Sequence, residues 1–217
     1  MISKFNLITL LIVFTFFACK NNNTLSSFKY ANKPDVLTCK GANYKLYKEA
    51  LYSFEDDIFK FYGKGNPNAS LLQAYSQFIR SSLYSQLKLE DIISEHTLAV
   101  FKALKEEEDL WDANNPKSYL NYKSKIISCV SQNIQDNGLK ITLNSLISTN
   151  FMSPQLFGPP LMAKFNNTLS DKYLATYVAL DLFYAKLFDV DLSKVNFDKP
   201  KPLDFNVIPP KANVNNQ

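Results

Sequence analysis

Residues 171–188 read DKYLATYVALDLFYAKLF, a stretch that is apolar nearly all the way round when it is wound as a helix. Its apolar residues at helical spacing are Tyr173, Leu174, Tyr177, Val178, Leu180, Leu182, Phe183 and Leu187. A helix that is hydrophobic on every side is normally buried inside a protein. Ser170 precedes it and is a favoured N-cap residue. The sequence therefore predicts a central helix over residues 171–188, capped by Ser170.

Further segments have apolar residues every three or four positions, with charged residues between them, as amphipathic helices do. They cover residues 43–62, 69–87, 89–110, 116–137 and 139–149. Gly63-Lys64-Gly65 predicts a turn between two helices, and Asn137-Gly138 predicts a helix end. We therefore expect an all-α fold, an irregular bundle of about five to six helices with an extended C-terminal tail.

The segment from Phe151 to Leu161 combines helix breakers with large apolar side chains. It predicts a rigid loop, because Pro154, Gly158, Pro159 and Pro160 restrict the backbone. A rigid apolar loop suits recognition, since little conformational freedom is lost on binding. The candidate binding residues are Phe151, Met152, Leu156, Phe157 and Leu161. The alternative is that these side chains fold back over the core as a lid.

The chain begins with Lys4 and an apolar run of 14 residues from Phe5 to Ala18, followed abruptly by the polar residues 20–23. This length is typical of the core of a secretory signal peptide, whereas a membrane-spanning helix needs roughly 20 apolar residues. We predict a signal peptide over residues 1–18, a tether over 19–38, a helical domain over 39–192 and an extended or disordered tail over 193–217.

The quartet Phe16-Phe17-Ala18-Cys19 resembles the lipobox of bacterial lipoproteins, of the kind found in the Bacteroidota. Ala18 and Cys19 match that motif, while Phe16 and Phe17 stand where Leu and a small residue are usual. The resemblance implies that Cys19 carries the lipid and that the protein is anchored in the cell envelope. No acidic residue follows Cys19 closely, which implies the outer membrane with the body facing the periplasm.

Two cysteines remain if Cys19 carries lipid, namely Cys39 and Cys129. Disulfides form and persist outside the cytoplasm, so these two residues are expected to pair. The alternative is two buried free thiols.

Composition and motifs argue against several functions. A net charge of +4 over 217 residues, with the charges interleaved, does not indicate a nucleic-acid partner. His96 is the only histidine, which excludes a di-iron bundle with two Glu-x-x-His pairs, and without a nucleophile motif it makes a Ser-His-Asp hydrolase improbable. We interpret His96 as a partly exposed helical residue. We expect no bound cofactor and no metal.

Three functions remain. The first is a non-enzymatic accessory or binding subunit of an envelope protein complex, held on the membrane by its lipid. The second is a lipoprotein that binds a small apolar or sugar ligand, with the 151–161 segment as a wall. The third is an envelope enzyme using carboxylates, either Glu55 with Asp56 or Glu90 with Asp91. The third ranks last because neighbouring acids on a helix point in different directions.

Overall fold

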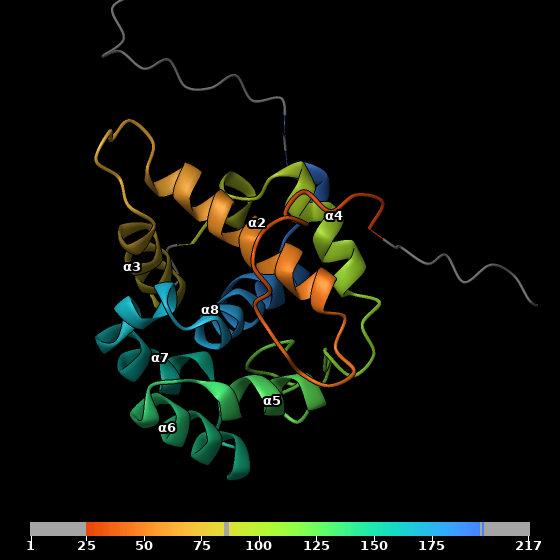
Figure 1. Cartoon of the computed structure of the whole chain (residues 1–217), viewed down its shortest axis with the longest axis vertical. Coiled ribbons are helices and arrows are strands. Elements are labelled where there is room, and N and C mark those ends of the chain that lie inside the picture. The colour runs from red at the N-terminus through yellow and green to blue at the C-terminus, as the bar shows by residue number, and fades with distance from the viewer. Residues whose placement is uncertain (1–24, 85–86, 196, 198–217) are drawn as a thin grey trace, which may run out of the picture.

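A computed structural model describes residues 25–84, 87–195 and 197. The signal peptide and Cys19, and nearly all of the 193–217 tail, therefore lie outside the described residues. The α-helices are α2 (Tyr44–Tyr62), α3 (Leu71–Leu83), α4 (Glu95–Leu104), α5 (Lys125–Asn133), α6 (Asn137–Ser148), α7 (Pro154–Ala163) and α8 (Lys172–Val178). Across this part of the chain, β pairing is limited to one bridge between Trp111 and Leu120. The predicted all-α class is confirmed (Figure 1).

Helix α8 lies in the middle of the bundle, as predicted, with the other helices around it (Figure 1). It continues into a π-helical turn, η4 (Ala179–Tyr184), and then a 3-10 turn, η5 (Ala185–Asp189). Every residue over 174–185 is buried. The predicted cap is wrong: the Asp171 carboxylate, not Ser170, accepts the first N–H groups of α8. Asp171 occupies the position from which a side chain reaches those donors.

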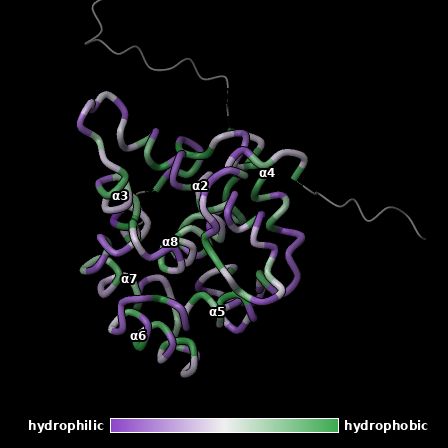
Figure 2. The backbone as a smooth tube through the Cα atoms, in the orientation of Figure 1, coloured by the Kyte–Doolittle hydropathy of each residue, from purple (hydrophilic) through white to green (hydrophobic). Residues whose placement is uncertain are grey.

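Helices α2 and α3 pack on the central helix through an aromatic cluster. The ring centroids of Phe54 and Phe78 lie 4.9 Å apart, and those of Phe54 and Phe183 lie 5.1 Å apart. Tilted and edge-to-face contacts of this kind stabilise a core beyond the apolar area they bury. Hydrophobic and hydrophilic residues alternate along the tube through α2 and α3 (Figure 2), as expected of amphipathic helices.

The turn after α2 agrees with its sequence. Gly63 ends the helix, and a Cβ there would lie 2.6 Å from the carbonyl oxygen of Phe59. Gly65 has a φ of +72°, a conformation that glycine adopts without strain. Gly63-Lys64-Gly65 is therefore a structural turn.

The helix predicted over 89–110 is divided in two. A 3-10 turn, η2 (Leu89–Asp91), comes first, and α4 starts only at Glu95 because the Ser94 hydroxyl caps it by accepting from the Thr97 N–H at 3.2 Å. Local side-chain bonding of this kind ends one helical run and starts another.

The helix predicted over 116–137 is shortened to α5, and its predicted end is wrong. Asn137-Gly138 forms the first turn of α6, because the Asp136 carboxylate accepts from the Leu139 N–H at 3.0 Å. An N-cap three residues ahead of an apolar stretch starts a helix even when Gly lies in its first turn.

The loop predicted over residues 151–161 is also wrong, because α7 starts at Pro154. The Ser153 hydroxyl accepts from the Leu156 N–H at 3.2 Å, and Pro154 occupies the first helical turn, where its missing N–H costs nothing. Pro159 and Pro160 leave the carbonyls of Gln155 and Leu156 without helical donors. Both of these residues are exposed, so water can satisfy their carbonyls.

Residues 29–38, expected to belong to a tether, instead lie across α2; we call them the strap. The backbone N–H groups of Lys29 and Tyr30 both donate to the carboxylate of Glu49. Lys48 of α2 is buried under the strap and donates to the Ala31 carbonyl at 3.0 Å. Val36 and Leu37 of the strap are core residues. The packed body therefore begins before residue 39, although its first helix starts at Tyr44.

The predicted disulfide is confirmed. Cys39 and Cys129 are bonded, with their Cα atoms 5.9 Å apart, and the bond joins the end of the strap to α5. The strap is thus fixed at one end by covalent linkage and along its length by hydrogen bonds.

Candidate functional site

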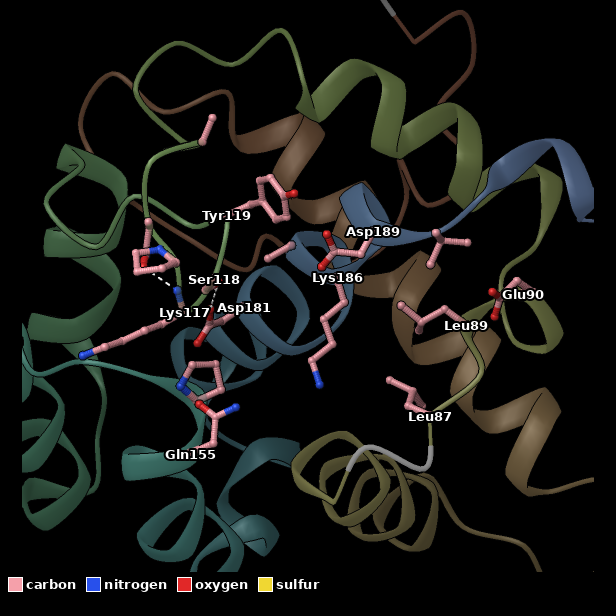
Figure 3. Close-up of a pocket in the computed structure, with 16 residues that line it drawn as sticks. Leu87, Leu89, Glu90, Lys117, Ser118, Tyr119, Gln155, Asp181, Lys186 and Asp189 are labelled. Carbon is pink, nitrogen blue, oxygen red and sulfur yellow. Dashed lines mark hydrogen bonds between the residues drawn. The ribbon is translucent and has the colours of Figure 1, made fainter.

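A pocket of about 640 Å³ opens where the central helix leaves its α-helical geometry (Figure 3). Its walls come from the 113–119 loop, the start of α7, the η4 and η5 turns and residues 87–90. The lining side chains are Leu87, Leu89, Glu90, Ala113, Asn115, Pro116, Lys117, Ser118, Tyr119, Pro154, Gln155, Asp181, Ala185, Lys186, Asp189 and Val190. Small-molecule sites commonly have volumes of about 300 to 1,000 Å³.

The inner wall of the pocket contains a buried carboxylate, Asp181, which is 1% exposed. Its oxygens accept hydrogen bonds from the Ser118 hydroxyl at 2.6 Å, the Tyr177 hydroxyl at 2.6 Å and the Tyr122 hydroxyl at 3.1 Å. Burial raises the pKa of Asp181, while these three donors and Lys186 act to lower it. We call Asp181 with its three hydroxyl donors the Asp181 cluster.

The π-helical turn positions Asp181 where it meets the 118–122 loop. A π turn widens a helix by one residue per turn and is frequently found at functional sites. The five residues from Tyr177 to Asp181 span the junction between α8 and η4, so one continuous helical segment supplies both a donor and the acceptor. Ser118 and Tyr122 complete the cluster from the loop.

Lys186 extends from η5 into the pocket, between the Asp181 side and the wall of Leu87, Leu89 and Glu90 (Figure 3). Its ammonium group donates to the backbone carbonyl of Ser82 at 2.6 Å. Burial lowers the pKa of Lys186, and the nearby Asp181 carboxylate partly opposes that change.

The rim of the pocket is polar and mixed in charge. It is formed by the exposed residues Glu90, Lys117, Gln155 and Asp189. Interaction with the nearby Asp189 carboxylate raises the pKa of Tyr119. The Tyr119 ring stacks on Phe188 at 4.6 Å between centroids.

The candidate binding residues of the 151–161 segment divide into two groups. Met152, Phe157 and Leu161 are buried, and the Phe157 ring meets the Tyr177 ring edge-on at 5.3 Å. Phe151 and Leu156 are 63% and 52% exposed. The buried residues therefore cover the core, as the lid alternative proposed. Of these five candidates, the two exposed residues are the ones open to a protein partner.

The same segment still contributes to pockets, through one candidate binding residue, Met152, and through two residues that were not binding candidates, Pro154 and Gln155. Pro154 and Gln155 line the Asp181 pocket. Met152 and Tyr122 line a neighbouring pocket of about 330 Å³, so the Asp181 cluster lies close to both.

His96, Glu55 and Asp56, which were also considered from sequence, make contacts that serve the structure. The Nε2 atom of His96 lies 2.6 Å from the Glu49 carboxylate, in hydrogen-bond contact. The same carboxylate holds the strap by accepting from the Tyr30 N–H. Glu55 meets Lys172 at 3.0 Å, whereas Asp56 meets Lys60 at 2.7 Å, so these neighbouring acids do not face one reacting atom.

The cluster was missed because its loop residues are unremarkable in sequence. A signal was nevertheless present, since Asp181 and Lys186 are the charged residues inside the otherwise uncharged stretch 173–188. Charged residues are rarely buried unless they are paired or functional. Periodicity alone did not show which loop would supply their partners.

Comparison with protein-family models, with curated proteins and with solved structures gave no significant match. Among the residues that the structure describes, no helix has the length and hydropathy needed to cross a membrane. The same residues contain no group of three or more His, Cys, Asp and Glu side chains arranged to hold a metal ion.

Proposed function

We propose that the protein is a lipid-anchored, non-enzymatic binding protein of the bacterial cell envelope that holds a polar small molecule in the Asp181 pocket. The observation that carries this proposal is a pocket of about 640 Å³ built on a π-helical turn with a buried carboxylate and a partly buried lysine. Such clefts with a few convergent polar groups are the usual form of ligand sites.

The polar lining favours a polar ligand over the apolar one considered from sequence. Nine of the 16 lining residues carry polar or charged side chains, and an apolar ligand would leave them without water or partners. The Asp181 cluster supports binding rather than catalysis, because Ser118 donates its proton to a carboxylate that two tyrosine hydroxyls already occupy. Such a network holds a wall rigid.

Native mass spectrometry of protein purified from its own cells tests the proposal. We expect additional bound mass, and we expect Ala113→Trp to abolish it by filling the pocket mouth. Ala99→Trp is the matched control, because Ala99 is also exposed but lies on α4 and outside the pocket lining. A spectrum without bound mass in the unmodified protein would contradict the proposal.

A second candidate function is that of an accessory subunit that docks on another envelope protein. It is supported by Phe151 and Leu156, which expose large apolar side chains beside the pocket-lining residues Pro154 and Gln155. Large exposed apolar side chains suit protein contacts. Cross-linking in membranes should then recover a partner that the double variant Phe151→Ser, Leu156→Ser loses. The absence of any reproducible partner would exclude this function.

The anchor is tested separately at Cys19. Cys19→Ala should move the protein from the membrane fraction to the soluble fraction, or leave the signal peptide uncleaved, and should abolish labelling by a fatty-acid probe. If the unmodified protein takes up no lipid label and the variant is still processed and membrane-bound, the lipobox interpretation is wrong.

A further inference from the structure

The ammonium group of Lys186 is the deepest cation of the pocket, and it has no acidic side chain in ion-pair contact within the described parts of the chain. Its hydrogen-bond acceptor there is the Ser82 carbonyl. An ammonium group has three donors, so two of them remain for other acceptors. Lys186 is also only partly exposed, so water reaches it incompletely.

Partial burial without a counter-ion is unfavourable for a charged amine. The lowered pKa of Lys186 is in line with this environment. Asp181 does not supply the missing counter-ion at close range, because no ion pair joins it to Lys186 and its hydrogen bonds come from Ser118, Tyr122 and Tyr177. An anionic group on a ligand would pair with Lys186 directly.

The remaining charges of the pocket limit what that anion can be. Glu90 and Asp189 place two carboxylates at the rim, against the single rim lysine, Lys117. A ligand with two or more negative charges would be repelled by them. A ligand with one negative and one positive group would be attracted both to Lys186 and to the two rim carboxylates.

We infer that the pocket binds a small zwitterion of the amino-acid type, with its carboxylate on Lys186 and its ammonium group toward Glu90 and Asp189. This inference rests on the proposed function and specifies the class of ligand. A neutral polyol, the nearest alternative, would form hydrogen bonds with the rim but would leave the Lys186 ammonium without an opposite charge.

Four probes of matched size separate these possibilities. They share a four-carbon chain: γ-aminobutyrate is a zwitterion, butyrate an anion, butylamine a cation and 1,4-butanediol a neutral diol. Binding of each probe to the full-length protein is followed by chemical-shift changes in the protein. We expect γ-aminobutyrate to bind at least threefold more tightly than butyrate, and butylamine and butanediol to bind more weakly than both.

Two variants assign the contacts. Lys186→Met should weaken γ-aminobutyrate and butyrate at least tenfold, while Lys102→Met, on the exposed side of α4 and outside the pocket lining, should leave both unchanged. Glu90→Gln should reduce the preference for γ-aminobutyrate over butyrate without weakening butyrate. Near-native thermal stability of each variant, measured in parallel, shows that the pocket is intact.

Butanediol binding as tightly as γ-aminobutyrate, or γ-aminobutyrate binding unaffected by Lys186→Met, would overturn the inference. So would a failure of all four probes to bind. The proposed function is judged independently by the mass that the protein carries from its own cells. Bound mass together with failed probes would reject the zwitterion and keep small-molecule binding.

Discussion

Three hydroxyl groups converge on the Asp181 carboxylate, and that single residue organises the inner wall of the pocket. A buried carboxylate is tolerated only where hydrogen bonds replace the water it has lost. Ser118 and Tyr122 come from a loop and Tyr177 from α8, so Asp181 also ties that loop to the central helix. Replacing Asp181 therefore tests both the buried charge and the link between the loop and the central helix.

The first prediction concerns the pH dependence of stability at this residue. Burial raises the pKa of Asp181 in the folded state above the unfolded value of about 3.9. The folded protein then binds more protons than the unfolded chain as the pH rises from about 4, so Asp181 contributes a stability that is lost as the pH passes through the folded pKa. Asp181→Asn removes this contribution.

Denaturant unfolding of both proteins between about pH 4 and pH 7 provides the measurement. The stability of the unmodified protein minus that of Asp181→Asn should fall with increasing pH. A difference that rises with pH would mean that the hydroxyl donors outweigh burial and hold the folded pKa below its ordinary value.

The second prediction compares adjacent residues on α7. Phe157 is 1% exposed and Leu156 is 52% exposed. Phe157→Ser should reduce the free energy of unfolding by about 3 to 5 kcal/mol, since it removes a buried ring. Leu156→Ser should change it by no more than about 0.5 kcal/mol. Equal effects of the two substitutions in chemical denaturation would place Phe157 on the surface, contrary to the structure.

At the scale of elements, α7 approaches α3 closely at one glycine. A Cβ built on Gly158 would lie 2.4 Å from a methyl carbon of Leu83. The breaker-rich sequence of α7 therefore serves a helix contact and not a loop. Glycine is needed at this position for the space it leaves between the two helices.

The third prediction tests that contact with a double-mutant cycle. Gly158→Ala forces Leu83 to move. It should therefore reduce the free energy of unfolding more in the unmodified protein than in a Leu83→Ala background, by about 1 kcal/mol or more. Helix propensity alone would favour alanine equally in both backgrounds. The four free energies of unfolding give the coupling, and a coupling near zero would show that α7 and α3 do not meet at this point.

The strap and the disulfide act on the whole molecule. The bond between Cys39 and Cys129 closes a loop spanning a sequence separation of 90 residues, which includes α2, α3 and α4. Closing a loop restricts the unfolded chain far more than the folded one. The strap then presents Lys29 and Tyr30 to Glu49, and the Glu49 carboxylate also meets His96.

The fourth prediction is the cost of losing this bond. The double variant Cys39→Ser, Cys129→Ser should be less stable by roughly 4.5 kcal/mol, the entropy of a loop of this size. Urea unfolding with and without reductant measures the effect, and reduction of the unmodified protein should reproduce the variant. An unchanged midpoint under reducing conditions would show that the bond does not stabilise the body.

The sequence by itself determined the helical class, the central helix over residues 171–188 and the cysteine pair, because each depends on a local pattern or on a simple count. Apolar periodicity reports which faces are buried, and this held for α2, α3 and α8. Helix ends were less predictable, since a single capping side chain such as Asp136 or Ser153 outweighs a Gly or Pro nearby. The anchor at Cys19 is a prediction from sequence that lies outside the described residues.

Tertiary structure alone decided the candidate site. Ser118 and Tyr122 lie 63 and 59 residues before Asp181 in the sequence, and no local pattern relates them to it. The π-helical turn that presents Asp181 to the loop arises from packing and leaves no period in the sequence. Lys186 and Glu90 share a pocket only because η5 and η2 are brought together across it. A sequence pattern describes neighbours along one helix, whereas a binding pocket is made from residues that only the packing of several elements brings together.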